Sequence, residues 1–269
     1  MEGALLKMPG ILERFSLAGK VALLTGGAGL YGKQITEALS QAGAVTCIAS
    51  RNLENLQSVA ENCEKVYPFC MDLEDENSIR RTVAEVIAKF GKIDILVNNA
   101  VTRCACKSWE LSMDDFDRSL RINGSSLFLL TKLAAEDMKK RHEGSIINIG
   151  SYLGMRGLNK TNYAGTDMYN SESWPSPIYF YEKGGMLNFT RFAASVLGPE
   201  GIRVNCISPG GFRTPDHPER FVQQYSANTF LGRLANETDL QGVIIFLASA
   251  ASSYITGANI PVDGGYTAK

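Results

Sequence analysis

Residues 19–32 read GKVALLTGGAGLYG, an apolar β run that ends in a group of glycines. The residues that follow, up to residue 42, have the apolar spacing of an amphipathic helix. Glycines where a strand passes into a helix let the backbone approach a pyrophosphate at the helix N-terminus. A tight turn without a ligand is the alternative for such a motif in isolation. The residues expected to contact a dinucleotide here are Gly26, Gly29, Leu30, Tyr31 and Gly32.

Outward from this turn, apolar β runs alternate with helical segments along the rest of the chain. After the first strand, further strands are predicted at 44–49, 66–71, 93–98, 145–149, 203–208 and 259–262. Helices are predicted at 31–42, 53–62, 75–90, 114–141, 179–197 and 237–248. Strands separated by helices form a parallel sheet with right-handed crossovers. The predicted fold class is therefore α/β, a three-layer doubly wound parallel sheet of the Rossmann type, whose ligand lies beyond the carboxyl ends of the strands.

The 269 residues contain no stretch of Pro, Ser or charge that would divide them, so we predict a single domain, 1–269, with an N-terminal lead at 1–14. The 27 Lys and Arg residues nearly balance the 28 Asp and Glu residues, which leaves no net field to attract nucleic acid or an anionic membrane. The longest apolar runs are too short to span a bilayer, and the first residues lack the apolar core of a signal peptide. These features predict a cytoplasmic protein with a small-molecule partner.

Six cysteines in a chain of this length do not form the dense disulfide framework of a small secreted domain, and we expect free thiols. Cys104 and Cys106 are close enough in sequence to suggest a metal. The two histidines, His142 and His217, do not stand near this pair, so the ligand set that zinc needs is incomplete. No metal site is predicted.

The end of the second predicted strand, CIASRN, bears on the choice of cofactor. A Rossmann site for NAD usually presents a carboxylate there to the adenosine ribose, whereas an NADP site presents a basic group to the 2′-phosphate. Here Ser50 occupies the carboxylate position and Arg51 follows it. A hydroxyl and a planar guanidinium suit a phosphate, so NADP is favoured over NAD. The alternative is that Arg51 is a solvated charge at the end of a strand.

The chain resembles the short-chain dehydrogenase/reductase family from about Phe15 onward. The motifs that carry the resemblance are TGGAGLYG at 25–32, MDL at 71–73, NNA at 98–100, IN at 122–123, GSIINIGS at 144–151, YFYEK at 179–183, NCISPGGFRT at 205–214 and VDGG at 262–265. The resemblance implies an NAD(P)-dependent oxidoreductase that acts on CH–OH groups and forms homodimers or homotetramers.

Two features depart from the usual pattern of this family. Compact members usually carry TGxxxGxG, whereas this turn fits TGxxGxxG, with Leu30 where a glycine is common. The connection at 158–177, LNKTNYAGTDMYNSESWPSP, is longer than an ordinary loop. The first departure bears on the geometry of the turn and not on dinucleotide binding itself, and the second marks a candidate functional loop.

The catalytic set that the resemblance implies consists of Asn123, Ser151, Tyr179 and Lys183. Tyr179 and Lys183 are four residues apart on a predicted helix, so they share one face. An ammonium near a phenol favours the phenolate, and Tyr179 can then act as general base in oxidation and as general acid in reduction. By the resemblance, Lys183 also bonds the nicotinamide ribose, Ser151 orients the substrate oxygen, and Asn123 holds a water that relays protons from Lys183.

Further cofactor contacts are implied by the family motifs. The residues expected beside adenine and the adenosine ribose are Asp72, Leu73, Asn99 and Ala100. Those expected at the nicotinamide end, near the carboxamide or the diphosphate, are Gly210, Phe212 and Thr214.

The predicted substrate is a polyhydroxy compound, because the loop at 158–177 carries more hydrogen-bonding groups than an acyl or steroid pocket would need. The glycine turn together with YAGTDM in this loop resembles the sugar-directed branch that includes gluconate 5-dehydrogenase. Candidate substrate residues are Arg103, Arg156, Tyr163 and Trp174. We expect the loop to close over the substrate as a lid, with a surface or subunit contact as the alternative.

Two other functions remain open at this point. One is a 3-oxoacyl reductase or another carbonyl reductase. The other, from a different class, is a dinucleotide-binding regulator that kept the fold and lost the chemistry. The intact Asn, Ser, Tyr and Lys set speaks against the regulator.

Overall fold

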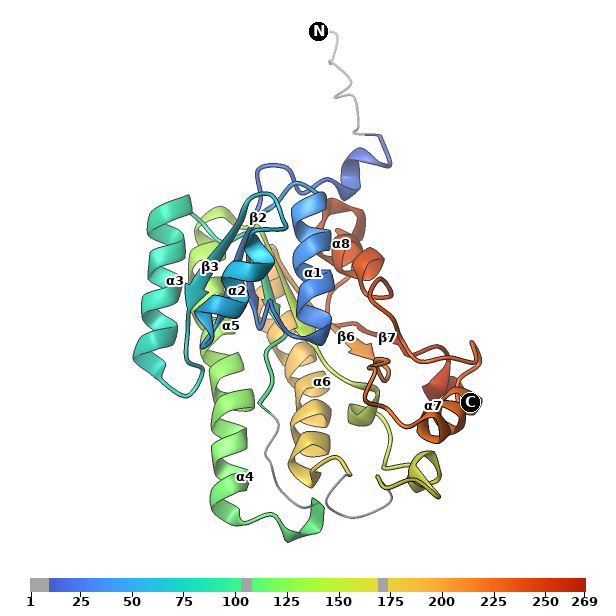
Figure 1. Cartoon of the computed structure of the whole chain (residues 1–269). Helices are drawn as coiled ribbons and strands as arrows, with labels where there is room; N and C mark the ends of the chain where they lie inside the picture. The colour runs from blue at the N-terminus through green and yellow to red at the C-terminus, as the bar shows by residue number, and fades with distance from the viewer. Residues whose placement is uncertain (1–9, 103–107, 169–173) are drawn as a thin grey trace, which may run out of the picture.

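The computed structural model describes residues 10–102, 108–168 and 174–269. Its centre is a seven-stranded parallel sheet with the strand order β3-β2-β1-β4-β5-β6-β7 (Figure 1). The strands are β1 Val21–Thr25, β2 Val45–Ser50, β3 Val66–Cys70, β4 Ile95–Asn98, β5 Gly144–Ile149, β6 Ile202–Pro209 and β7 Asn259–Val262. The prediction of a doubly wound parallel α/β sheet is confirmed.

Helices cover both faces of the sheet and complete the three layers. They are α1 Leu30–Gln41, α2 Leu53–Ala60, α3 Glu76–Phe90, α4 Met113–Leu120, α5 Ser126–Met138, α6 Pro177–Leu197, α7 Glu219–Ala227 and α8 Gln241–Ala248. Helices α3, α5 and α6 pack on one face, and α1, α2 and α8 pack on the other. No helix within the described ranges is long and apolar enough to cross a membrane.

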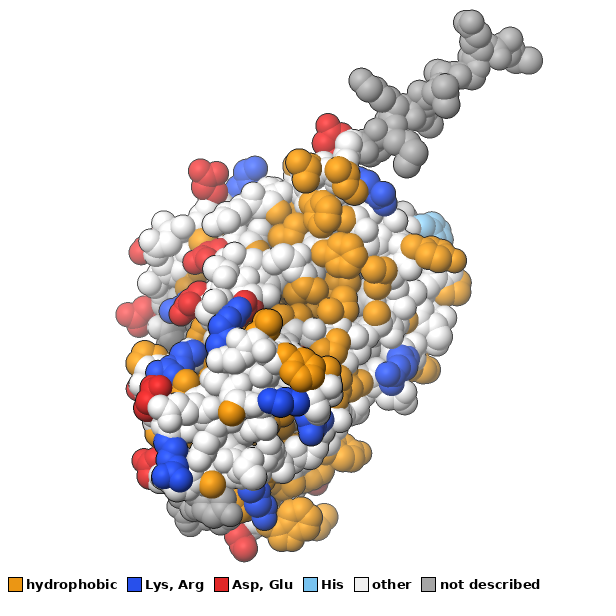
Figure 2. All heavy atoms as spheres, turned by 90° about the vertical axis from the view of Figure 1, so that its right-hand side faces the viewer, with side chains coloured by type: hydrophobic (Ala, Val, Ile, Leu, Met, Phe, Trp, Pro, Cys, Tyr) orange, Lys and Arg blue, Asp and Glu red, His pale blue; other side chains and the backbone are white. Residues whose placement is uncertain are grey.

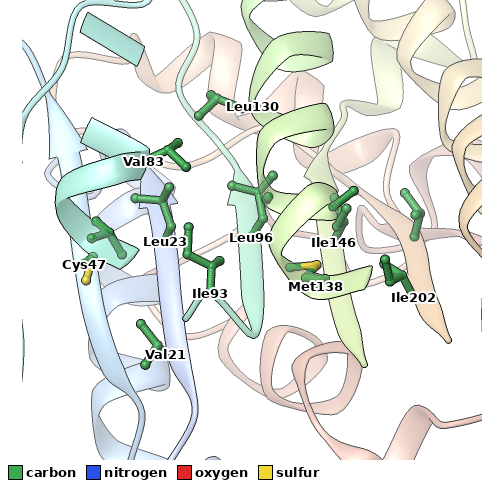
Figure 3. Close-up of a cluster of buried hydrophobic side chains, with 14 of the residues drawn as sticks. Val21, Leu23, Cys47, Val83, Ile93, Leu96, Leu130, Met138, Ile146 and Ile202 are labelled. Atoms are coloured by element: carbon green, nitrogen blue, oxygen red, sulfur yellow. The ribbon is translucent and has the colours of Figure 1, made fainter. Parts of the chain in front are cut away.

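The central strands bury both of their faces, as a sheet covered on two sides requires. In β1, Leu23 belongs to the apolar cluster beneath α3, α5 and α6, where it lies with Leu96 and Ile146 of neighbouring strands (Figure 3). Its chain neighbours Ala22 and Leu24 belong to the cluster beneath α1, α2 and α8. Because successive residues of a strand point to opposite faces, one apolar run supplies both cores.

Several predicted elements begin or end a few residues from their observed bounds, such as the helix predicted at 237–248, which begins at Gln241, and two larger differences concern whole elements. The helix predicted at 114–141 is interrupted by a π-helical turn, Arg121–Ser125, between α4 and α5, and Asn123 lies in this turn. Helix α7 was not predicted, because its nine residues are mostly polar and bury only Phe221 and Tyr225. π-Helical turns inside helices often occur at functional sites.

The direction of winding reverses at β1. This strand pairs with β2 on one side and with β4 on the other. The connections that follow β1 and β4 therefore leave the sheet at the same edge, and a crevice lies between them. Such a reversal is where ligands bind in open α/β sheets. The glycine turn follows β1 directly, and Asn99 follows β4 directly.

A buried chain of amide and hydroxyl groups crosses the sheet just below this edge. Asn98 of β4 donates to Asn148 Oδ1 of β5 at 2.9 Å, and Asn148 Nδ2 donates to Thr190 Oγ1 of α6 at 3.0 Å. Asn148 and Thr190 are almost completely buried. Buried polar groups stabilise one arrangement when they are partnered, and the side chains of Asn148 and Thr190 are, so their bonds hold α6 against the sheet.

Candidate active site

A pocket of about 1140 Å³ lies at the carboxyl edge of the sheet and brings together residues that are far apart in sequence. The predicted residues in its wall are Gly26, Gly29, Leu30, Tyr31, Gly32, Ser50, Arg51, Asp72, Leu73, Asn99, Ala100, Ser151, Tyr163, Trp174, Tyr179, Lys183, Gly210, Phe212 and Thr214. Asn123 lies behind the wall, next to Ile122, which does line the pocket. Arg103 falls outside the described residues.

The glycine turn has the close backbone contacts that explain its glycines. Gly26 has a φ of 69°, and its carbonyl accepts from Gly29 N at 3.0 Å. A Cβ on Gly32 would lie 2.0 Å from the same carbonyl oxygen. Gly26 therefore makes the turn, and Gly32 lets the first turn of α1 pack against it.

The unusual position of Leu30 is accommodated without strain in this turn. Leu30 is the first residue of α1, with Gly29 as its N-cap, and its side chain is 53% exposed. The contacts are closest at Gly32 and at Gly27, where a Cβ would lie 2.6 Å from the Ile48 side chain, and the residues at the start of α1 line the pocket.

Tyr31 links the glycine turn to the loop that follows β6. Its hydroxyl donates to Gly210 O at 2.9 Å, and its ring meets Phe212 edge-on at 5.2 Å between centroids. Burial raises the pKa of the Tyr31 hydroxyl well above its usual value, so it remains a neutral donor. The glycine turn and the loop after β6 are therefore held together by one side chain.

The end of β2 presents Ser50 and Arg51 to the pocket. The Ser50 hydroxyl donates to Asn52 O at 3.3 Å, and Asn52 caps α2 by accepting from Asn55 N. Arg51 is exposed, and within the described part of the chain its guanidinium forms no ion pair. A guanidinium in this position is suited to a phosphate on the adenosine ribose.

The segment after β4 is tied to the glycine turn by side-chain bonds. The amide nitrogen of the Asn99 side chain donates to Thr25 O at 2.9 Å and to Gly26 O at 3.1 Å. The backbone nitrogens of Asn99 and Ala100 donate to Thr25 Oγ1 at 3.0 and 2.9 Å. Asn99 thus orients the backbone on which a dinucleotide would lie.

Helix α6 positions Tyr179 and Lys183 over the end of β5. The helix begins at Pro177, which has no backbone N–H. Because the N–H groups of a first helical turn have no partner within the helix, proline costs no hydrogen bond there. Lys183 is buried, its ammonium donates to Ile149 O at 2.6 Å, and its Nζ lies 5.7 Å from the centre of the Tyr179 ring. The ammonium is therefore anchored to the sheet beside the phenol, as the four-residue spacing predicts.

Ser151 follows β5 and faces the same pocket. Its backbone is extended and its Oγ accepts from Leu153 N at 3.1 Å, which starts a short 3₁₀ turn, Tyr152–Gly154. That turn contacts α6 closely, because a Cβ on Gly154 would lie 2.6 Å from Lys183 O. The accepted bond orients the Ser151 hydroxyl so that its proton can be donated to a substrate oxygen.

Asn123 is held by the protein in a way that the sequence did not indicate. Its Oδ1 accepts from Thr102 N at 2.8 Å, and its Nδ2 donates to Thr102 O at 2.9 Å. The same Nδ2 lies 3.0 Å from Glu182 Oε2 and 3.2 Å from Ser119 Oγ. The side chain joins three segments, and the relay water that the resemblance implies stays a prediction.

In the described part of the loop at 158–177, the polar side chains of Asn159 and Asn162 bond to other groups of the protein. Asn159 caps a 3₁₀ turn, Lys160–Tyr163, and Asn162 donates to the Tyr266 hydroxyl at 2.8 Å. Arg156, just before the loop, donates to Tyr266 O at 2.8 Å and stacks near its ring, so it lies away from the pocket wall. Of the predicted substrate residues, the structure brings Tyr163 and Trp174 to the pocket and not Arg156.

Several pocket residues were missed from the sequence. They are Ser119, Tyr152, Leu153, Met168, Ile178, Glu182, His217, Phe221, Tyr225 and Leu234. His217, Phe221 and Tyr225 come from α7 and the turn before it, which carried no clear signal. Glu182 could have been found, because it precedes Lys183 and lies three residues after Tyr179 on the same helix.

Cysteines and other metal ligands form no centre in the described ranges. Cys47 and Cys206 are buried, and burial raises the pKa of the Cys47 thiol to about 12. Cys104 and Cys106 lie outside the described residues. No group of three His, Cys, Asp or Glu side chains among the described residues could hold a metal ion.

Comparison with known proteins gives the family. The model of a family described as enoyl-(acyl carrier protein) reductase matches residues 29–267. The 3-oxoacyl-[acyl-carrier-protein] reductase of Thermotoga maritima is 34% identical, over 93% of this chain and 98% of that protein. The 2-dehydro-3-deoxy-D-gluconate 5-dehydrogenase of Dickeya dadantii is 31% identical, over 96% of this chain and all of that protein.

Solved structures agree with this result. A short-chain type dehydrogenase/reductase from Mycobacterium marinum has a TM-score of 0.85 and 30% identity, over 97% of this chain and all of that one. A gluconate 5-dehydrogenase from Burkholderia cenocepacia, in complex with NADP and tartrate, has a TM-score of 0.83 and 30% identity over the same shares. The chain belongs to the short-chain dehydrogenase/reductase family, whose members are NAD(P)-binding oxidoreductases that act on CH–OH and carbonyl groups.

The contact between Gly32 and Gly26 yields a prediction about cofactor affinity. In Gly32→Ala, the added Cβ cannot stay 2.0 Å from Gly26 O, so the turn must open. We expect the dissociation constant for NADPH, measured by fluorescence titration, to rise about tenfold or more, which corresponds to about 1.4 kcal/mol. The control is Gly242→Ala on α8, where nothing lies within 4 Å of the new Cβ. Equal affinity in Gly32→Ala and the unmodified protein would contradict this account of the turn.

Proposed function

We propose that this enzyme transfers a hydride between NADP and a secondary alcohol or ketone. The observation that carries the proposal is that Ser151, Tyr179 and Lys183 lie in the wall of the same pocket as the glycine turn. A non-catalytic regulator would need none of these three groups at the nicotinamide end of the pocket. Their placement beside one another favours catalysis.

The residues of the chain perform the proton transfer and the orientation. The bound cofactor supplies or accepts the hydride. In reduction, the Tyr179 hydroxyl gives its proton to the substrate oxygen, and in oxidation the phenolate takes that proton back. Lys183, held by Ile149 O, stabilises the phenolate with its charge, and the Ser151 hydroxyl donates to the substrate oxygen in both directions.

The preference for NADP rests on Arg51 and Ser50 at the end of β2. The 2′-phosphate would be bonded by the exposed guanidinium, and Ser50 presents no carboxylate that would repel it. The Burkholderia relative was solved with NADP, which supports the same choice.

The proposed cofactor preference is tested by reversing the charge at Arg51. We expect NADPH to bind the unmodified protein at least about tenfold more tightly than NADH, the effect of about 1.4 kcal/mol from a charge-assisted bond. In Arg51→Asp the order should invert, because a carboxylate repels the phosphate and accepts from the free ribose hydroxyls. Arg80→Asp on α3, where Arg80 pairs with Glu76, is the control. Calorimetry that found NADH bound as tightly as NADPH by the unmodified protein would overturn the assignment.

The substrate that we propose is a sugar or a sugar acid. The pocket wall that contains Tyr179 also offers the hydroxyl of Ser151 and the imidazole of His217, which can bond hydroxyls of one ligand. Tyr163 and Trp174 offer flat faces from the loop at 158–177, which we propose as the wall that closes over the substrate. The relatives from Dickeya and Burkholderia act on compounds of this class by their names.

A 3-oxoacyl thioester is the second candidate. The apolar part of the wall, with Leu153, Ile178 and Leu234, would accept an acyl chain. The relative from Thermotoga, at 34% identity, carries that activity in its name. The two candidates place different demands on the pocket, because an acyl chain would leave the polar groups of the pocket wall without hydrogen-bond partners.

A substrate panel followed by two variants tests the proposed reaction. Sugar acids, polyols and 3-oxoacyl thioesters are compared by the absorbance of NADPH, in both directions of reaction. With the best compound, Tyr179→Phe should lower kcat by at least about 100-fold and leave the affinity for NADPH nearly unchanged, because only the proton-transferring oxygen is lost. Lys183→Met should impair both. Near-normal turnover by the Phe variant would place the general acid elsewhere.

We also propose that the enzyme works in the cytoplasm as a homodimer or homotetramer. Phe128 of α5 and Phe192 and Val196 of α6 are at least half exposed, which symmetric pairing of these helices would bury. Figure 2 shows a further band of apolar side chains on the face where α8 and β7 lie in Figure 1. Light scattering should give the mass of two or four chains. A monomer at micromolar concentration would contradict the proposal.

A further inference from the structure

Glu182 is a buried carboxyl group between α6 and the π turn, and the proposed mechanism does not use it. Its side chain is only 8% exposed and lines the pocket beside Ser119 and Ile122. Taking a carboxylate out of water is costly unless hydrogen bonds compensate for the loss. An apolar side chain in this place would avoid that cost, so the contacts of Glu182 should have a specific use.

Both carboxyl oxygens of Glu182 accept hydrogen bonds from the other wall of the site. Ser119 Oγ of α4 donates to Oε1 at 2.8 Å, and Asn123 Nδ2 of the π turn donates to Oε2 at 3.0 Å. Burial raises the pKa of Glu182, while these two donors and the charge of Lys183 act in the opposite direction. The bonds define what we call the Asn123 network, formed by Thr102, Ser119, Asn123 and Glu182.

The Asn123 network connects the parts of the site that must keep their relative positions during the reaction. Asn123 holds the backbone of Thr102, which lies in the pocket wall after β4, by bonds to its N and O. Glu182 connects Asn123 to α6, where Tyr179 and Lys183 lie on either side of it in sequence. A shift of α6 relative to Thr102 would change the distance between the proton donor and the cofactor.

We propose that Glu182 is a positioning residue for hydride transfer, which holds Asn123 and the π turn against α6 through its two hydrogen bonds. The inference rests on the proposed function and adds a residue to it. Glu182 acts through Asn123 and Ser119 and not by contact with the reacting atoms. Geometry of this kind affects kcat strongly, because a displacement of about 1 Å can reduce a rate about 100-fold.

Two substitutions distinguish the role of the hydrogen bonds of Glu182 from the role of its side-chain volume. In Glu182→Ala both bonds are lost. In Glu182→Gln, the amide oxygen can accept from Asn123 and the amide nitrogen can donate to Ser119 Oγ, so the network is kept without the charge. We expect kcat to fall about 100-fold in the Ala variant with KM nearly unchanged, and to recover to within about threefold of normal in the Gln variant.

Asp137→Asn is the matched control for loss of stability. Asp137 is a buried carboxylate on α5 that accepts from Ile93 N at 2.9 Å and pairs with Arg141, at the opposite edge of the sheet from the pocket. This variant should lower the midpoint of thermal unfolding and leave kcat unchanged. The proposal fails if Glu182→Ala keeps normal kcat, if Glu182→Gln is as slow as the Ala variant, or if Asp137→Asn loses kcat to a similar extent.

A second readout keeps this test independent of the proposed function. Hydrogen–deuterium exchange at residues 113–126 reports whether α4 and the π turn are held in place. Faster exchange there in Glu182→Ala, restored in Glu182→Gln, is the expected result even if no compound of the panel is turned over. Absence of turnover by the unmodified enzyme would count against the proposed reaction, whereas unchanged exchange in the Ala variant would overturn the role of Glu182.

Discussion

The parallel direction of all seven strands is the constraint on which the site depends. It places the carboxyl end of every strand at one edge of the sheet, so short segments distant in sequence become neighbours there. Thr25, Asn98 and Ile149 end three adjacent strands, and each is followed within a few residues by a group that lines the pocket. The residues that follow the strand ends can therefore form the site, while the residues inside the strands pack the core.

Much of this arrangement could be predicted from the sequence because it depends on local patterns. The apolar β runs, the glycine turn and the Tyr179 to Lys183 spacing each reflect one element, and all three have the predicted placement in the structure. The π turn at Asn123 was missed because its residues are compatible with an ordinary helix. Helix α7 was missed because it covers the pocket and not the sheet, and so lacks a long apolar stripe.

The polar residues illustrate what single-sequence reasoning cannot supply. Arg156 and Asn162 are hydrogen-bonding groups near a catalytic strand, and from sequence alone they suit a substrate. Their partners are Tyr266 O and the Tyr266 hydroxyl, more than 100 residues away along the chain. Whether a donor bonds a ligand or another group of the protein depends on which groups lie near it in the folded chain. No local sequence pattern gives that information. The sequence analysis did not single out Glu182, although its carboxyl group is buried in the site.

Helix α8 has a consequence for how the chain folds. It packs beside α1 on one face of the sheet, and Gln34 of α1 accepts from Leu240 N at 2.9 Å across 206 residues of sequence. Until α8 arrives, the apolar side of α1 lacks its neighbour, although β1, β2 and β3 can already pair. Contacts of such long separation slow the search for the native state and leave apolar surface exposed in intermediates. The layer that covers β1 on this face is therefore assembled from segments near the two ends of the chain.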